Sequence, residues 1–334
     1  MRATKLWAAV LALGLAAAAR AGDWQTIPLD QVTKDKPGFG GLSGVVVDRD
    51  TGDVYVCVSD IGVFRSDDKG KTWKRLAFFS DKGRTEQPGC MLIDPRGGAG
   101  RLLLARVYGG AVEMVNMAHT SDRITVDGKS SHVDWCAIDW TDAKPNLILA
   151  LKHESGGTLI VSRDGGKTFD EIGKGYGPAY IFDKDTAVVA EAKTKDKLKP
   201  GLLRTTDGAK TFQPCGDYAA TALPKFRDGA LYWLTDGGLI RTTDAGKTWE
   251  KLGDVKDARY GPIFGKDAKQ MFVLTGAGVV ESSDGGATWS KPVAPPPELK
   301  GVSPLTWIEY DPVNDVVYIM KMGSDLYWME HGKK

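Results

Sequence analysis

The chain has 334 residues, with 44 basic and 43 acidic side chains, so its formal net charge is +1. This near-neutral balance offers no extended basic field for nucleic acid or an anionic membrane. The length allows a large core, and all-β folds of this size often form one domain. Four cysteines are few for a secreted protein built on disulfides, so we expect buried free thiols, with one Cys57–Cys90 bridge as the alternative; the four are Cys57, Cys90, Cys136 and Cys215.

The first residues have the pattern of an export signal. Arg2 and Lys5 precede an apolar run at residues 6–19, and Ala19-Arg20-Ala21 fits a small-x-small cleavage site. The run is short for a membrane span. We therefore expect a signal peptide at residues 1–21, cleavage near Ala21-Gly22, a secreted or periplasmic location and one mature domain at 22–334. Removing residues 1–21 takes away three basic residues and leaves a formal charge of −2, and no other apolar stretch approaches spanning length.

One eight-residue pattern, Ser/Thr-x-Asp-x-Gly-x-Thr-aromatic, recurs in five near-copies, in one of which Ala209 replaces the glycine: SDDKGKTW (66–73), SRDGGKTF (162–169), TTDGAKTF (205–212), TTDAGKTW (242–249) and SSDGGATW (282–289). The hydroxyl and the carboxylate can accept backbone N–H bonds and close a tight turn. Glycine supplies the positive φ, and the aromatic residue starts the next strand. A calcium loop would need a further carboxylate at its closing position, which the pattern lacks. The pattern therefore predicts a repeated structural turn.

The spacing of these turns predicts the number of blades. A repeat of about 40 residues with several short strands is typical of a propeller. The first interval is twice as long as the others, and residues 88–128 fill the gap with strand-like segments. The chain ends with three strands, and residues 23–29 resemble a missing outer strand, with Trp24 in the place of Trp73. We predict an all-β, seven-bladed propeller whose last blade is closed by the N-terminal strand, which removes an open edge.

The repeated pattern resembles the Asp-box, or BNR, repeat of sialidase-like β-propellers. With the strands of each blade named A to D from the axis outward, that resemblance places the turns between strands C and D. It places ligands on the opposite face, among the B–C and D–A loops. Bases, carboxylates and aromatic residues at that mouth suit a polar ligand, particularly a sugar, although a solvated rim has the same composition. The residues expected to bind ligand are Arg106, Tyr108, Trp135, Lys152, Glu154, Tyr176, Arg259, Tyr260 and Trp307.

Local features separate the enzyme families with this repeat. The chain has no Arg-Ile-Pro motif and only Arg106 and Arg259 near the mouth, which argues against a true sialidase. Residues 40–44 (GGLSG) and 59–62 (SDIG) resemble the xyloglucanase-type glycoside hydrolases, and the resemblance places Asp60 at a catalytic carboxylate position. Glycoside hydrolysis needs a second carboxylate, for which Glu191 and Asp236 across the ring are the candidates. The alternative is that Asp60 only forms a turn.

A third resemblance is to the photosystem II assembly and stability factors, which are exported single propellers of this length that bind other proteins. The binding face of those factors resembles a basic patch, and this sequence shows no comparable concentration of basic residues. We expect a secreted propeller that binds an extracellular glycan or other polar ligand, with hydrolysis left open. The rival is a non-catalytic scaffold for an exported protein. We expect a monomer without cofactor or metal, since the four histidines have no ligand spacing.

Overall fold

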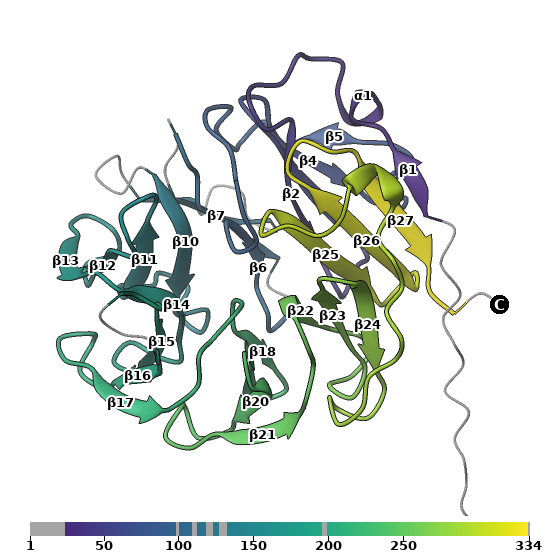
Figure 1. The fold of residues 1–334 in the computed structure, drawn as a ribbon. Helices are drawn as coiled ribbons and strands as arrows, with labels where there is room; N and C mark the ends of the chain where they lie inside the picture. Colours follow the sequence, from purple (N-terminus) through teal and green to yellow (C-terminus); the bar gives the residue numbers. More distant parts are fainter. Residues whose placement is uncertain are drawn as a thin grey trace, which may run out of the picture.

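The computed structural model describes residues 24–97, 100–108, 112–117, 123–126, 132–195 and 199–332. They form seven antiparallel sheets arranged as blades around a common axis (Figure 1). This confirms the predicted all-β, seven-bladed propeller. The expected signal peptide lies outside the described residues. Within the described ranges, no helix is both long enough and apolar enough to cross a membrane.

Each blade is an antiparallel meander. The first contains β2 (Leu42–Val47), β3 (Val54–Val58), β4 (Gly62–Ser66) and β5 (Lys74–Arg75). The second contains β6 (Met91–Ile93), β7 (Arg101–Leu104), β8 (Val112–Asn116) and β9 (Arg123–Val126). The third contains β10 (Val133–Ile138), β11 (Ile148–Lys152), β12 (Leu159–Ser162) and β13 (Asp170–Gly173). The fourth contains β14 (Tyr176–Ile181), β15 (Ala187–Glu191), β16 (Leu202–Thr205) and β17 (Gln213–Gly216).

The last three blades differ in how they end. The fifth has β18 (Lys225–Arg227), β19 (Ala230–Thr235), β20 (Gly238–Thr242) and β21 (Glu250–Gly253). The sixth has β22 (Ala258–Phe264), β23 (Met271–Thr275) and β24 (Gly278–Ser282), and its expected outer strand is reduced to a bridge between Val279 and Val293. Pro292 precedes that bridge, and a proline cannot donate to a strand ladder. The seventh has β25 (Thr306–Asp311), β26 (Val316–Lys321) and β27 (Leu326–Glu330), and two short helices, α1 (Leu29–Val32) and η2 (Pro297–Leu299), lie in connections.

The N-terminal strand closes the ring. The strand β1 (Gln25–Ile27) pairs with β27 in antiparallel register, Ile27 opposite Leu326, and Figure 1 shows the two side by side. The Ile27 side chain is 3% exposed. Trp24 donates its indole N–H to the Ala294 carbonyl at 2.8 Å, which ties the strand to the preceding connection. The predicted closure is therefore confirmed.

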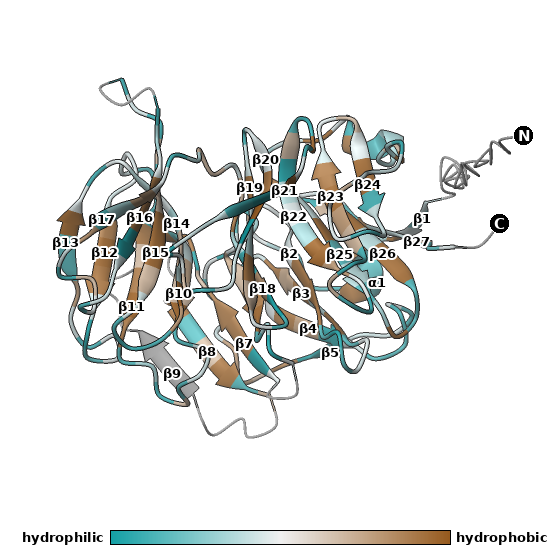
Figure 2. Cartoon of the chain, turned by 90° about the horizontal axis from the view of Figure 1, so that it is seen from below, coloured by the Kyte–Doolittle hydropathy of each residue, from teal (hydrophilic) through white to brown (hydrophobic). Residues whose placement is uncertain are grey.

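Apolar side chains fill the sheets and the spaces between them. All five residues of β3 are buried, and Figure 2 shows that most inner and middle strands are hydrophobic, while the loops and outer strands such as β5 and β21 are largely hydrophilic. The Trp249 indole is half-buried, 6.0 Å from the ring of Trp233 in its own blade and directly over Gly216 of the fourth blade. This position between blades agrees with the packing role expected for the aromatic residue of the repeated turn.

The five repeated turns share one set of hydrogen bonds. In the turn at residues 162–169, the Ser162 hydroxyl accepts the Gly166 N–H and donates to Asp164, both at 2.8 Å. The Thr168 N–H and hydroxyl both donate to Asp164, and these bonds lower the pKa of Asp164 to about 2. The corresponding N–H reaches the first hydroxyl in the other four turns. Because the carboxylate is used within the turn, the predicted structural role is confirmed.

All four cysteines are free thiols, so the alternative Cys57–Cys90 bridge is not formed. Cys57, Cys90 and Cys136 are buried, as expected. Burial raises the pKa of Cys90 and of Cys136 to about 12. These two thiols are therefore packing groups, since a thiol that stays protonated is a poor nucleophile.

Candidate functional site

A cavity of about 620 Å³ opens on the face that carries the D–A loops. Four of these loops contribute to it, together with the B–C turn that contains Asp236, and the inner strands β10, β14 and β22 form part of its wall. Four of the residues predicted to form the site line this mouth cavity: Trp135, Asp236, Arg259 and Tyr260. The structure therefore brings together, in one cavity, predicted ligand contacts from three different blades.

The groups in the mouth cavity differ in how fully they are bonded. The Asp236 side chain is exposed and has no hydrogen-bond or ionic partner within the described ranges. Arg259 is half-exposed and pairs with Asp257 at 2.6 Å. The Trp135 indole N–H is buried without a partner among the described residues, while Tyr260 is buried and its hydroxyl accepts a hydrogen bond from Lys225. The cavity thus combines a free carboxylate, a guanidinium and two aromatic walls.

An aromatic rim, formed by Phe39, Arg84 and Tyr108, stands on the same loop face. The Arg84 guanidinium lies 4.9 Å from the Phe39 ring centroid and 4.7 Å from the Tyr108 ring centroid. Phe39 is 75% exposed and Tyr108 is 43% exposed, and Val313 is the one other large hydrophobic side chain exposed in the described part of the chain. A guanidinium between two aromatic faces holds both rings in place. The rim is therefore an ordered apolar surface in contact with water.

A hydrogen-bonded chain connects the rim to the mouth cavity. The His153 Nδ1 lies 2.6 Å from an Asp134 carboxylate oxygen, and its Nε2 lies 3.3 Å from the Tyr108 hydroxyl. Asp134 also lines the mouth cavity, and burial raises the pKa of its carboxyl group. Tyr108 itself has a left-handed φ of 55° and donates its N–H to His132. These contacts hold Tyr108 in place and connect it through His153 to Asp134.

The three predicted catalytic carboxylates do not meet in the mouth cavity. Asp60 is exposed, but one of its oxygens accepts the Gly83 N–H at 2.9 Å, and its φ of 57° is that of a turn residue. Glu191 accepts the Gly201 N–H at 2.9 Å, within its own blade. Only Asp236 lines the cavity, where Asp134 and Asp257 are the other carboxylates.

Two predicted ligand contacts are closed off from the mouth. Arg106 is fully buried, and its guanidinium bonds to Glu113 at 3.0 Å and to the Lys82 carbonyl at 3.0 Å. Trp307 is fully buried against Gly44 of the first blade. Their burial leaves no surface for a ligand. Both side chains instead contact residues of the neighbouring blade or its connection.

The remaining predicted contacts lie outside the mouth cavity. Lys152 forms an ion pair with Glu171 at 2.5 Å, and Tyr176 packs against Phe212 with ring centroids 6.0 Å apart. Glu154 is exposed and accepts the Tyr108 hydroxyl at 3.4 Å, so it belongs to the aromatic rim. The rim residues Phe39 and Arg84 were missed, since no local pattern in the sequence brings their two loops together.

No protein-family model matches the sequence, and no curated protein matches it. Among solved structures, the β-propeller domain of Cps50 (Swd1) from Myceliophteria thermophila has a TM-score of 0.58 at 10% identity, over 89% of this chain and 98% of that one. The extracellular domain of the putative one component system BT4673 from B. thetaiotaomicron has a TM-score of 0.56 at 9% identity, over 92% of this chain. This chain spans only 40% of that one.

A third similar structure is YCF48 bound to a D1 peptide. Its TM-score is 0.54 at 14% identity, over 95% of this chain and 99% of that chain. At such identities the likeness shows the fold alone. Together with the seven sheets, it defines the class of this protein as a seven-bladed β-propeller.

Proposed function

We propose that this protein is an exported binding propeller whose mouth cavity recognises an extracellular glycan. The observation that carries the proposal is the cavity of about 620 Å³ in which Asp236, Arg259 and Trp135 meet. Ligand sites of about 300–1,000 Å³ typically combine apolar or aromatic walls with a few placed polar groups. A sugar matches this combination, because its ring has an apolar C–H face and its hydroxyl groups both donate and accept hydrogen bonds.

Binding is better supported than hydrolysis. A glycosidase needs two carboxyl groups on either side of the bond that breaks. Asp60 and Glu191 each accept a backbone N–H outside the cavity, so their structural roles are sufficient to account for them. Asp236 is left as a hydrogen-bond acceptor for a ligand hydroxyl.

The test is a glycan array probed with the mature protein, residues 22–334, followed by titration of the best ligand. Asp236→Asn should weaken binding about 10-fold, because a hydrogen bond to a charged group contributes about 1.5–3 kcal/mol. Asp170→Asn is the matched control, since Asp170 is 74% exposed on the outer strand β13, where it pairs with Arg163. Failure to bind any glycan, or equal affinity of Asp236→Asn and the wild type, would contradict the proposal.

The aromatic rim supports a second candidate, which is binding of an extended peptide from an exported protein. Aromatic and arginine side chains carry most of the energy at protein interfaces, and Phe39, Arg84 and Tyr108 form such a group. The likeness to a propeller solved with a bound peptide supports the same idea. Phe39→Ala should then reduce capture of a partner from exported proteins while glycan binding is unchanged. Loss of glycan binding in this variant would instead join the rim to the glycan site.

A further inference from the structure

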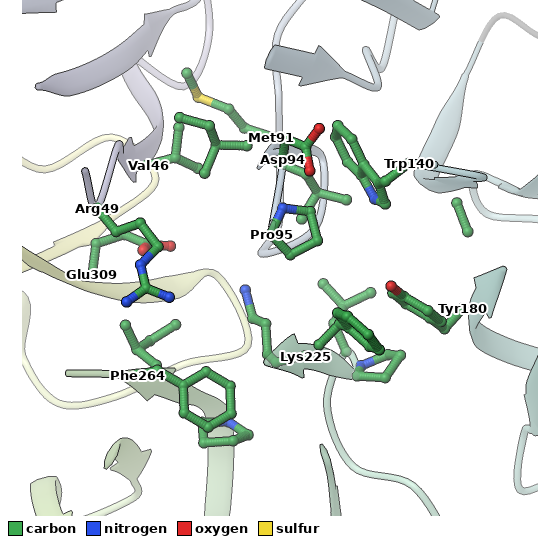
Figure 3. Close-up of a pocket in the computed structure, with 18 of the residues that line it drawn as sticks. Val46, Arg49, Met91, Asp94, Pro95, Trp140, Tyr180, Lys225, Phe264 and Glu309 are labelled. Carbon is green, nitrogen blue, oxygen red and sulfur yellow. The ribbon is translucent and has the colours of Figure 1, made fainter. Parts of the chain in front are cut away.

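A second cavity, of about 140 Å³, lies within the ring toward the end where the A–B turns are. All seven inner strands contribute to its wall: β2, β6, β10, β14, β18, β22 and β25. Figure 3 shows this axial cavity with its side chains pointing inward from separate blades. Because it does not include Trp135, Asp236 or Arg259, it is distinct from the mouth cavity.

Lys225 places an ammonium group in the axial cavity without a close counter-ion. Its Nζ donates to the Tyr260 hydroxyl at 2.9 Å and lies 4.8 Å from the Tyr260 ring centroid. Figure 3 shows the amine directed into the cavity. No carboxylate of the described residues lies within 4.0 Å of it. A half-buried ammonium group with one neutral hydrogen-bond partner retains donors for a ligand and gains from a nearby anion.

The nearby carboxyl groups leave this positive charge only partly compensated. Glu309 is 8% exposed and reaches Lys225 only through the Tyr260 hydroxyl, which donates to it at 3.4 Å. Burial raises the pKa of Glu309 to about 7 and lowers the pKa of Lys225, while the attraction between the two groups favours the charged form of each. Asp94 also lines the cavity, but Arg96 and Arg101 bind its carboxylate.

Arg49 adds a second cation at the axial cavity. Figure 3 shows its guanidinium directed toward the same space as the Lys225 amine. The nearest carboxylate to Arg49 is that of Asp50, 4.0 Å away and half-exposed. A carboxylate ligand can therefore accept hydrogen bonds from two cations that the described part of the protein leaves weakly paired.

The rest of the cavity is apolar and aromatic. Tyr180 stacks on Phe226 with ring centroids 5.5 Å apart, and Phe264 and Trp140 form further walls. A dry apolar cavity of about 150 Å³ is known to hold benzene. The axial cavity therefore has room for one aromatic ring or one short branched chain.

We propose that the axial cavity binds a small organic monocarboxylate whose body is a single ring or a short branched chain. The carboxylate lies between Lys225 and Arg49, and the apolar body packs among Phe226, Phe264 and Tyr180. This site is independent of glycan binding at the mouth. The ligand class follows from the two cations and the limited apolar volume.

The test is calorimetric titration of the mature protein with phenylacetate, compared with phenylacetamide, which has the same shape without the charge. Phenylacetate should bind at one site with a Kd of about 1 mM or below, in keeping with its size. Phenylacetamide should bind at least about 10-fold more weakly, because it loses the charge-assisted hydrogen bonds. Equal binding of the two compounds, or no saturable binding of phenylacetate, would overturn the proposal.

Variants locate the bound acid. Lys225→Met and Arg49→Gln should each weaken phenylacetate binding about 10-fold or more. Arg49 is half-buried, so its replacement tests the site even if Lys225→Met fails to fold. Lys184→Gln is the control, since Lys184 is 81% exposed in an A–B turn. This substitution removes the same charge from the same end of the ring. If phenylacetate binds Arg49→Gln and the wild type equally, the acid occupies another site and the proposal is wrong.

Discussion

Replacement of Ile27 by alanine tests how much the closing strand contributes to stability. Ile27 is the buried residue of β1, and it packs so closely on Gly70 of the first repeated turn that no Cβ could fit there. The change removes about three buried carbon atoms, at roughly 0.8 kcal/mol each, and leaves a cavity between the seventh and first blades. We expect the free energy of unfolding to fall by about 3 kcal/mol.

The assay is thermal unfolding followed by calorimetry and circular dichroism. A folded domain of roughly 300 residues has an unfolding entropy of about 0.6 kcal/mol/K, so the Tm should fall by about 5 °C. Thr26→Ala is the matched control, because Thr26 is exposed on the same strand and should change stability by less than about 0.5 kcal/mol. If Ile27→Ala melts within 1 °C of the control, about the precision of the comparison, the strand does not couple the blades as described.

Three further changes test other parts of the structure. Trp249→Ala should lower the free energy of unfolding by about 2–3 kcal/mol in denaturant titrations, since the indole is only half-buried, and an unchanged midpoint would remove it from the packing between blades. His331→Gln removes ion pairs with Glu281 and Asp315 that raise the pKa of His331 above 6.5. Its cost should therefore be full below pH 6.5 and disappear as pH rises through the folded-state pKa, whereas a cost independent of pH would refute the charge effect. Burial raises the pKa of Glu309 from 4.5 to about 7, so this group should lower the free energy of unfolding of the wild type as pH rises from 4.5 to about 7. Glu309→Gln should reduce that decrease, and parallel plots of stability against pH for the two proteins would refute this effect.

The fold could be predicted because the residues that determine it form a short local pattern that repeats along the chain. Each turn pattern fixes a hairpin through a hydroxyl, a carboxylate and a residue with positive φ, and the distance between patterns gives the blade. Closure of the seventh blade could be predicted because the chain ends with only three strands, while residues 23–29 resemble the missing outer strand, with Trp24 in the place of Trp73. The predicted outer strand of the sixth blade is instead reduced to one bridge, which lies beside Pro292, a residue that cannot donate to a strand ladder.

The site was less predictable because its contacts are not local. The assignment of residues to loops placed Trp135 and Asp236 correctly at the mouth. Trp135 lies near the start of β10, and Asp236 directly follows β19. It placed Arg106 there too, because the sequence does not show that Glu113 in the next strand binds its guanidinium in the core. Lys225 and Glu309 lie far apart in the chain, in the inner strands β18 and β25, and no local pattern pairs them. Their common position on the axis follows from the curvature of the ring rather than from any motif.

The pairing of β1 with β27 also has a consequence for how the chain folds. Each blade is built from contacts between neighbours in sequence, so blades can form one after another as the chain becomes available. Closure instead joins residues about 300 positions apart, and bringing such distant ends together costs roughly 5 kcal/mol of chain entropy. Until that contact forms, β27 presents an unpaired edge that another chain can occupy. Among the propeller strands that the structure describes, β1 comes first in the chain and its partner β27 comes last, so β1 waits for the whole ring to be made.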